Sequence, residues 1–512
     1  MKKKCPSFPG LVEKSANFIY KERKILIVAV LVSFFIFAAL EFFFLRDWDM
    51  LVRILNADYL FHDGYYFEPE RALLESVIIG LFSYPFGSYA VYAFIAVTIF
   101  LFAFSLKEFA SAFKSDFYLT LLLLMSPFII FYGIKNGSDL FVMSFIILFV
   151  VYVKKKSPLS GLFMGLAFLS KYYAILFIPI LLFMLRKNRK DITHFFLAIL
   201  ILIATLIPYF VYNFIEFGNF IFTFAMAFLD FTVEVSNSMP FVYAGLEELV
   251  VPVIAIAVLF ITWKSRKIKK VLSLNIYILL VGLVISGYIY YASNWLMVGG
   301  LGTFRFALPL LIFSSLILSS FLKKQDILWL VPFFVISLII AILIMEPMIP
   351  QTGTGEFKAA ISDFSSVYNT TNCTVSSNFW VELDYYGLPA ESGINYSSNY
   401  SGTPIVNLGP VNTTYPLVYH NSTYYSRIFI YGGNFCTYHK VIIDFLTQHN
   451  VLFNNGSSVF GGSNVSTNKA KFPYKNLPIS ACYWLFSTKY KIQPFYSLCD
   501  YINNAFKLIK NA

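Results

Sequence analysis

The chain has 512 residues, of which 58% are hydrophobic and 13% are charged, and its mean hydropathy is +0.69. A composition this apolar excludes a water-soluble domain built around one buried core and indicates an integral membrane protein. The net charge of +11 does not indicate nucleic-acid binding, because the basic residues are spread over short polar loops and form no basic stripe with interleaved aromatic side chains.

Apolar stretches recur through the first 345 residues, and short polar loops separate them. Most are long enough to cross about 30 Å of hydrocarbon as helices. They predict a polytopic α-helical membrane domain with about 11 transmembrane helices, at 25–45, 88–106, 116–133, 138–153, 159–170, 172–186, 194–213, 247–263, 273–291, 305–322 and 327–345. The fifth and sixth spans are short enough to form a tight hairpin.

The lysines and arginines of the short loops predict how these helices are oriented, because such residues are in excess on the cytoplasmic side. They cluster on alternate loops: Lys2 to Lys4 with Lys21, Arg23 and Lys24; Lys107 and Lys114; Lys154 to Lys156; Arg186, Lys187, Arg189 and Lys190; Lys264, Arg266, Lys267, Lys269 and Lys270; and Lys323 with Lys324. The N-terminus is therefore predicted in the cytoplasm and the C-terminus outside. The first helix has a basic flank and no small-residue cleavage site, which is typical of a retained signal anchor.

Beyond Met345 the composition changes to Asn, Ser, Thr, Tyr and Gly, which predicts a transmembrane domain over 1–345 and an extracytoplasmic domain over 346–512. Two segments of this second domain, "CTVSSNFWVEL" and "RIFIYGG", have the composition of strands, while "EFKAAISDFSSVY" and "YHKVIIDFLTQHN" have the apolar spacing of helices. We therefore expect a small α/β domain.

Two groups of residues agree that this domain lies outside. Eight N-x-S/T sequons occur, more than chance alone predicts for so Asn-rich a segment, at Asn369, Asn372, Asn395, Asn399, Asn412, Asn421, Asn455 and Asn464. The domain also holds four of the five cysteines, Cys373, Cys436, Cys482 and Cys499. An even number is consistent with two disulfides in an oxidising compartment, with three pairings open, and the alternative is buried free thiols.

Ionisable residues are almost absent from the predicted helix centres and gather at the outer helix ends. Those outside the cytoplasmic loops include Glu41, Asp47, Asp49, Arg53, Asp58, His62, Asp63, Arg71, Lys135, Asp139, Lys171, Glu216, Asp230, Glu234, Glu247, Glu248 and Arg305. Charges along a transport path would lie within the helices, so this distribution favours chemistry at the outer membrane surface. No zinc-site, phosphate-loop or Ser-His-Asp pattern occurs.

The stretch "RDWDMLVRILNADYLFHDGYYFEPER" directly follows the first predicted helix and places Asp47 and Asp49 around Trp48. Two carboxylates at i and i+2 could share a divalent cation, or one could act as a base while the other holds metal or substrate. The alternative interpretation is a plain helix boundary, where the carboxylates are hydrated and Trp48 anchors the interface.

This stretch resembles the first external loop of the GT-C superfamily, the polytopic glycosyltransferases that carry a modified DxD motif after their first transmembrane helix. The nearest local likeness is to GPI-type and protein O-mannosyltransferase-like members, through Asp47, Asp49, Val52, Ala57, Gly64, Tyr65 and Tyr66. Later segments also resemble superfamily helices: "KNGSDLFVMSFIILFVVYVKKK", "GLFMGLAFLSKYYAILFIPILL" with a lysine at the hairpin tip, and "FRFALPLLIF". The chain has no WWDYG-like motif, and "YYFEPERALLES" replaces the tyrosine-proline stretch of the GPI-type enzymes, so donor and acceptor do not carry over.

The resemblance implies an inverting hexosyltransferase, with mannose one candidate sugar, that uses a polyprenyl- or dolichyl-phosphate donor and a hydroxyl of a glycan, lipid or protein. We assign the base to Asp49 and a supporting or metal contact to Asp47, although the two could exchange. Lys171 and Arg305 are assigned to the donor phosphate, with snorkelling to lipid headgroups as the alternative. Four further residues are candidates for sugar or acceptor contacts: Arg53, His62, Asp63 and Arg71. No cofactor is certain, and Mg²⁺ or Mn²⁺ held by Asp47 and Asp49 is the one candidate.

Two other classes of function remain open. A flippase or transporter of lipid-linked sugars would bind the same lipid, but it would need a polar path through the helices. A non-catalytic glycosylated envelope protein would tolerate loss of Asp47 and Asp49. For the transferase, the predicted location is an archaeal plasma membrane or the endoplasmic reticulum.

Overall fold

The computed structural model describes residues 48–227, 308–345, 354–392 and 403–433, together with two short strands at 452–453 and 490–491 and the single residues 17 and 21. Short gaps within these ranges fall at 63, 65–66, 70, 128, 131–132, 134–138, 186–188, 412, 414 and 423–426. The predicted spans 25–45, 247–263 and 273–291 and the helix expected over "YHKVIIDFLTQHN" lie outside the described residues. The count of about 11 helices therefore stays a prediction.

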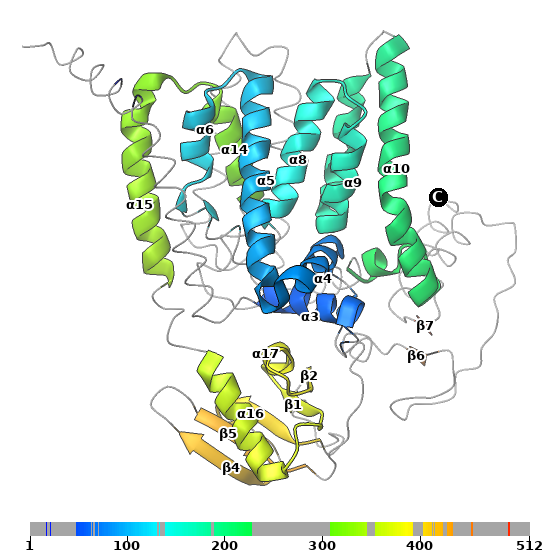
Figure 1. Ribbon diagram of the computed structural model, residues 1–512, viewed down its shortest axis with the longest axis vertical. Coiled ribbons are helices and arrows are strands. Elements are labelled where there is room, and N and C mark those ends of the chain that lie inside the picture. Colours follow the sequence, from blue (N-terminus) through cyan, green and yellow to red (C-terminus); the bar gives the residue numbers. More distant parts are fainter. Residues whose placement is uncertain are drawn as a thin grey trace, which may run out of the picture.

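Most of the described helices stand side by side in one array (Figure 1). They are α5 (Ala90–Phe113), α6 (Phe117–Leu124), α8 (Asp139–Lys154), α9 (Ser160–Ser170), the 3₁₀ helix η2 (Tyr172–Met184), α10 (Arg189–Phe217), α14 (Leu308–Ser319) and α15 (Ile327–Met345). α8 lies inside the array, because nearly all of its side chains are buried and contribute to the main apolar core. The predicted spans 138–153, 159–170 and 327–345 coincide with α8, α9 and α15 to within a residue or two.

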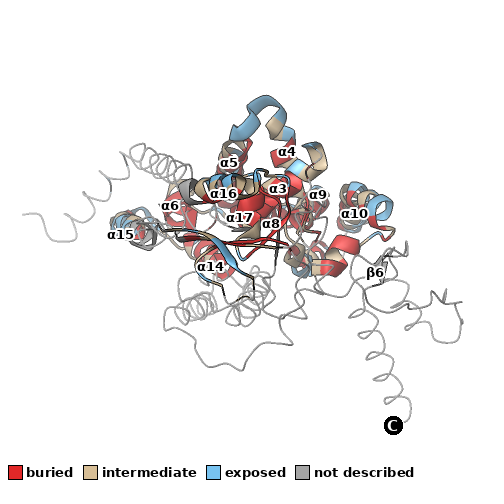
Figure 2. Cartoon of the chain, turned by 90° about the horizontal axis from the view of Figure 1, so that it is seen from below, coloured by how far each residue is buried: buried red, intermediate tan, exposed pale blue. Residues whose placement is uncertain are grey.

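Apolar residues remain exposed along the outer helices of the array. Figure 2 shows exposed positions along α10. Large exposed hydrophobic residues recur along that helix, including Leu200, Ile203, Ile207, Val211 and Phe214. Two described stretches, Leu74–Phe113 and Lys190–Phe217, are long and apolar enough to cross a membrane. A continuous apolar surface of this kind suits contact with lipid, whereas water would penalise it.

One end of the array carries the basic loops. Lys155 pairs with Glu108 near the end of α5, and Lys156 pairs with Asp191 in the first turn of α10. Lys154 donates to the carbonyl of Ala112, also on α5. Three loops that the sequence analysis assigns to the cytoplasm therefore meet at the same end. Which side of the membrane this end faces stays a prediction.

Two helices that the sequence analysis did not predict lie across the opposite end (Figure 1). These are α3 (Trp48–His62) and α4 (Leu74–Phe86), which pack against each other. The stretch after the first predicted helix is thus not simply a loop, and Asp49 lies in the first turn of α3. Gly87, with a φ of 54°, ends α4, and the 3₁₀ turn η1 (Gly87–Tyr89) leads into α5.

Helices α9 and α10 approach closely at two glycines, which gives a testable prediction. A Cβ atom on Gly161 would lie 1.8 Å from the backbone oxygen of Ala198, whereas one on Gly165 would lie 2.7 Å from a methyl carbon of the Thr205 side chain. The Thr205 Cβ, which cannot rotate away, would also lie 2.8 Å from the Cβ added at Gly165. The contact at Gly161 is much closer and is with the helix backbone, so Gly161→Ala should cost about 1–3 kcal/mol of stability and Gly165→Ala less. Thermal unfolding of the two purified variants in detergent checks this, and equal shifts in midpoint would contradict it.

The described residues between 354 and 433 form a sheet covered by short helices, here called the α/β unit. Its elements are α16 (Thr354–Tyr368), β1 (Val375–Ser377), α17 (Trp380–Tyr385), β2 (Ala390–Ser392), β3 (Ile405–Leu408), β4 (Leu417–Ser422) and β5 (Arg427–Tyr431). The sheet order is β2-β1-β3-β5-β4; β1 runs parallel to β2 and β3, while β5 is antiparallel to β3 and β4. Elsewhere β6 (Leu452–Phe453) pairs with β7 (Tyr490–Lys491).

Two local expectations for this unit are confirmed, since "EFKAAISDFSSVY" lies in α16 and "RIFIY" forms β5. The expectation for "CTVSSNFWVEL" is wrong in its second half. Only Val375–Ser377 is a strand there, because Ser377 Oγ accepts a hydrogen bond from the Phe379 amide and the chain turns into α17. The boundary of an extracytoplasmic domain at residue 346 stays a prediction.

Cys373 is buried and disulfide-bonded, so it is not a free thiol. Its partner and the other predicted disulfide cysteines, Cys436, Cys482 and Cys499, lie outside the described residues, so the pairing stays open. Of the predicted glycosylation sites, Asn369 and Asn372 are exposed, and Asn421 donates to Asp363 at 3.2 Å. The remaining sequons, at Asn395, Asn399, Asn412, Asn455 and Asn464, also lie outside the described residues.

Candidate active site

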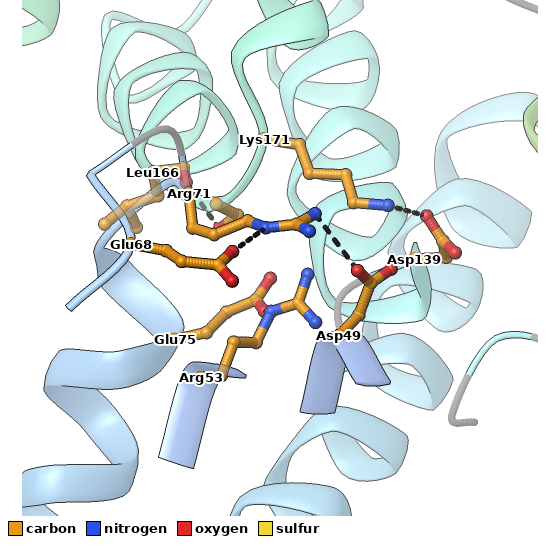
Figure 3. Close-up of polar contacts among 9 residues, drawn as sticks. Asp49, Arg53, Glu68, Arg71, Glu75, Asp139, Leu166 and Lys171 are labelled. Atoms are coloured by element: carbon orange, nitrogen blue, oxygen red, sulfur yellow. Dashed lines mark hydrogen bonds and ion pairs between the residues drawn. The ribbon is translucent and has the colours of Figure 1, made fainter. Parts of the chain in front are cut away.

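Four of the residues selected from the sequence come together at the end of the array that carries α3 and α4. Asp49 lies in the first turn of α3 and Arg53 one turn later, while Arg71 lies between α3 and α4. Lys171 lies between α9 and η2, at the tip of the predicted hairpin. Figure 3 shows the charged ends of these side chains converging on one region. We refer to them and their ionic partners as the charged cluster.

Arg71 is the most exposed member of the charged cluster, and it pairs with Asp49. Asp49 Oδ1 lies 3.0 Å from a terminal guanidinium nitrogen of Arg71, and the Arg71 Nε donates to Glu68 at 3.1 Å. The side chains of Asp49 and Arg71 are 13% and 32% exposed, so a substrate can reach both.

Hydrogen bonds from neighbouring side chains to its backbone hold the segment that carries Arg71 in place. The side chain of Asn56 on α3 donates to the Glu68 carbonyl at 3.0 Å and accepts from the Glu68 amide at 2.8 Å. The Tyr172 hydroxyl donates to the carbonyl of Arg71 at 3.4 Å. Since these contacts come from α3 and η2, Arg71 is positioned by the same elements that carry Asp49 and Lys171.

A second ion pair lies beneath the first. Arg53 on α3 pairs through Nε with Glu75 in the first turn of α4, and their side chains are 5% and 0% exposed. Among the described residues, no other hydrogen-bond partner contacts the Glu75 carboxylate. Burying two charges is costly unless they neutralise each other, so the pair holds α3 and α4 in one arrangement. The Glu75 carboxyl group also interacts electrostatically with Lys171, Asp139 and Asp49.

Lys171 completes the charged cluster from the other side. Its backbone is extended, with φ −152° and ψ 131°, and this break between α9 and η2 aims the side chain at Asp139, which begins α8. The ammonium group of Lys171 forms an ion pair with Asp139, and their side chains are 24% and 8% exposed. The pair leaves Lys171 partly accessible, as a residue that binds an incoming anion must be.

None of the remaining residues predicted from the sequence is placed at the charged cluster by the described part of the chain. His62 lies at the far end of α3 from Asp49, where its Nε2 contacts Ser83 Oγ at 2.6 Å, so the structure does not bring it to the charged cluster. Asp47, Asp63 and Arg305 lie outside the described residues. Of the two residues predicted to bind the donor phosphate, only Lys171 lies in the part of the chain that the structure describes.

Sequence reasoning gave no role to three members of the charged cluster, Glu68, Glu75 and Asp139. Asp139 was already recognised as an ionisable residue at an outer helix end. The signal for Glu75 was available as well, because it is a lone carboxylate at the start of the apolar run "LESVIIGLF". A charge in such a position is retained only with a partner.

A metal ion is not supported by the part of the chain that the structure describes. No three His, Cys, Asp or Glu side chains come together there as metal ligands. Asp49 pairs with Arg71, whose positive charge would repel a cation beside it. The candidate Mg²⁺ or Mn²⁺ site of Asp47 and Asp49 therefore stays a prediction that depends on Asp47.

Comparison with known families decides the reaction class. Residues 69–287 match the model of glycosyltransferase family 87. This is a GT-C-type family of membrane glycosyltransferases, so the protein is an enzyme that transfers a sugar. The match covers less than half of the chain; it includes Arg71, Glu75, Asp139 and Lys171 but begins after Asp49. No curated protein and no solved structure gives a significant match.

The family match confirms the expectation of a glycosyltransferase and supports the predicted superfamily. The finer likeness to GPI-type and protein O-mannosyltransferase-like enzymes is not confirmed. A transferase also implies a sugar donor and an acceptor as partners. The flippase and the non-catalytic envelope protein are accordingly the less favoured alternatives.

Proposed function

We propose that the protein transfers a hexose, with mannose one candidate, from a polyprenyl-phosphate donor to a hydroxyl group of a glycan, lipid or protein. The observation that carries the proposal is the charged cluster itself. One partly exposed carboxylate, Asp49, lies among the cations Arg71 and Lys171 at the end of an apolar helix array. This is the arrangement that a phosphate leaving group and an acceptor hydroxyl require.

The reaction needs one base and one anion site. The acceptor oxygen forms a bond to the anomeric carbon while the bond from that carbon to the phosphate oxygen breaks, and the configuration inverts. Asp49 takes the proton of the acceptor hydroxyl as its oxygen attacks. The phosphate leaves with the bonding electrons, and Lys171 and Arg71 stabilise its growing charge. A phosphate is a good leaving group without protonation, so no second carboxylate is needed as an acid.

The structure supports different roles for the two arginines. Arg71 is partly exposed and reaches Asp49, which suits a residue that contacts substrate. Arg53 was also expected to contact substrate, but its side chain is 5% exposed and paired with Glu75. We therefore assign Arg53 to holding α3 against α4, and Arg305 remains a further proposed phosphate ligand beside Lys171 and Arg71.

We place the reaction at the extracytoplasmic face. The charged cluster lies opposite the basic loops, and loops rich in lysine are typical of the cytoplasmic side. The α/β unit lies at the same end as the cluster (Figure 1) and contains the disulfide-bonded Cys373, which favours an oxidising compartment. An archaeal plasma membrane and the endoplasmic reticulum both meet this condition.

The donor class is tested by supplying membranes with either a labelled polyprenyl-phosphate hexose or the matching labelled nucleotide hexose. Membranes that contain the protein should move label from the lipid donor to endogenous acceptors. Membranes without it should not, and the nucleotide sugar should be inert once synthesis of the lipid donor is blocked. Transfer from the nucleotide sugar under that block would contradict the proposed donor.

A further inference from the structure

The α/β unit lies outside the family match, yet it contacts the helix that carries the candidate base. Helix α17 packs against α3, as both views of the chain show (Figures 1 and 2). Val381 of α17 is fully buried in a small apolar cluster with three residues of α3: Leu51, Val52 and Leu55. Trp380 and Tyr385, at the two ends of α17, pack against the same cluster.

The contacted residues lie within the first two turns of α3, next to Asp49. The first turn of a helix lacks part of its backbone hydrogen bonding, so its position depends on what packs against it. On one side, Arg53 holds α3 to α4, and Asn56 holds α3 to the loop that connects the two helices. On another side, Leu51 and Val52 are fully buried together with Val381. The α/β unit therefore supplies one of the contacts that fix the orientation of Asp49.

Helix α17 is itself anchored in the α/β unit. A helix of six residues is not stable alone, so its position is set by the fold around it. Leu383 is part of the core of the unit, and Asp384 accepts a hydrogen bond from the Ala390 amide at the start of β2, at 2.8 Å. Helix α17 thus presents residues in two directions, Leu383 into the α/β unit and Val381 toward α3.

We propose that the α/β unit is a brace for the transferase site and that Val381 is a positioning residue, which holds α3 so that Asp49 meets the acceptor hydroxyl. This inference rests on the proposed role of Asp49 as base. Val381 touches no reacting atom. Displacing a base by about 1 Å can cost as much as a hundredfold in rate, so even a small loosening of α3 should be visible in kcat.

The test compares Val381→Ala with Val406→Ala in the full-length protein. Val406 is equally buried, but it belongs to the core of the α/β unit, so its truncation removes the same atoms without touching the contact with α3. Val381→Ala should lower kcat about tenfold and leave the KM for the lipid donor within twofold. Val406→Ala should keep kcat within twofold of the wild type. Val381→Ile, which keeps a branched apolar side chain at the contact with α3, should retain most of the wild-type kcat.

A second measurement does not depend on sugar transfer. Amide hydrogen exchange over residues 49–56 should quicken in Val381→Ala and remain unchanged in Val406→Ala. If exchange in α3 responds equally to both variants, or to neither, the brace is wrong. If exchange quickens but kcat does not fall, Val381 contributes only to packing and the positioning role is wrong. If the wild type transfers no sugar, the proposed function fails, and the exchange data alone decide whether α17 holds α3.

Discussion

Asp49→Asn is expected to lower the rate of sugar transfer at least a hundredfold at equal protein abundance. Asparagine has nearly the same shape and can still accept a hydrogen bond from Arg71, but it cannot take a proton from the acceptor hydroxyl. General base catalysis typically contributes about 10²–10⁴-fold to a rate, which sets the size of the loss. The measurement is the release of label from a polyprenyl-phosphate hexose in membranes. The KM for this donor should change little, because Asp49 is assigned to the acceptor.

Asp58→Asn is the matched control for this experiment. Asp58 lies on the same helix as Asp49 but is exposed, and it is not part of the charged cluster. Its neutralisation changes the net charge of α3 equally, so the rate should stay within about twofold. Equal activity of wild type and Asp49→Asn would remove Asp49 as the base. Asp47→Asn is the next variant to measure, since the two aspartates could exchange roles.

The array helices and the tip lysine could be predicted from the sequence because their signals are local. α8 and α15 are uninterrupted apolar runs, and Lys171 is a single charge at a break between two such runs. Each of these patterns follows from the cost of placing charge in hydrocarbon. Neither needs knowledge of what packs nearby.

The helices α3 and α4 and the ion pairs could not be predicted, because their causes are not local. The apolar side chains of α3 are buried against Val381, which lies far along the chain. Without that partner, the mixture of apolar and charged residues in this segment indicates a loop at the membrane interface. Glu75 is stabilised by Arg53, and Asp139 by Lys171, without any motif that links the partners. Such pairings become visible only when the helices are placed side by side.

The buried pair of Arg53 and Glu75 leads to the second large effect. Glu75→Ala removes the carboxylate that neutralises a guanidinium group with 5% exposure. Breaking a buried pair in this way typically costs about 3–5 kcal/mol, because the remaining charge is left uncompensated. We expect a strongly lowered thermal midpoint in detergent and a reduced amount of protein in the membrane. Glu108→Ala is the control, since the Lys155–Glu108 pair is half-exposed and such pairs are worth about 0–1 kcal/mol.

The double variant Arg53→Leu/Glu75→Leu separates a structural role from a direct one. Replacing both partners of a buried ion pair by apolar residues is often neutral or stabilising, so the double variant should recover most of the stability that Glu75→Ala loses. If Arg53 only holds α3 against α4, sugar transfer should return with the stability. A double variant that is stable but inactive would instead show that Arg53 contacts the substrate, as the sequence analysis expected. If Glu75→Ala and Glu108→Ala lower the thermal midpoint by equally small amounts, the Arg53–Glu75 pair does not hold the two helices together.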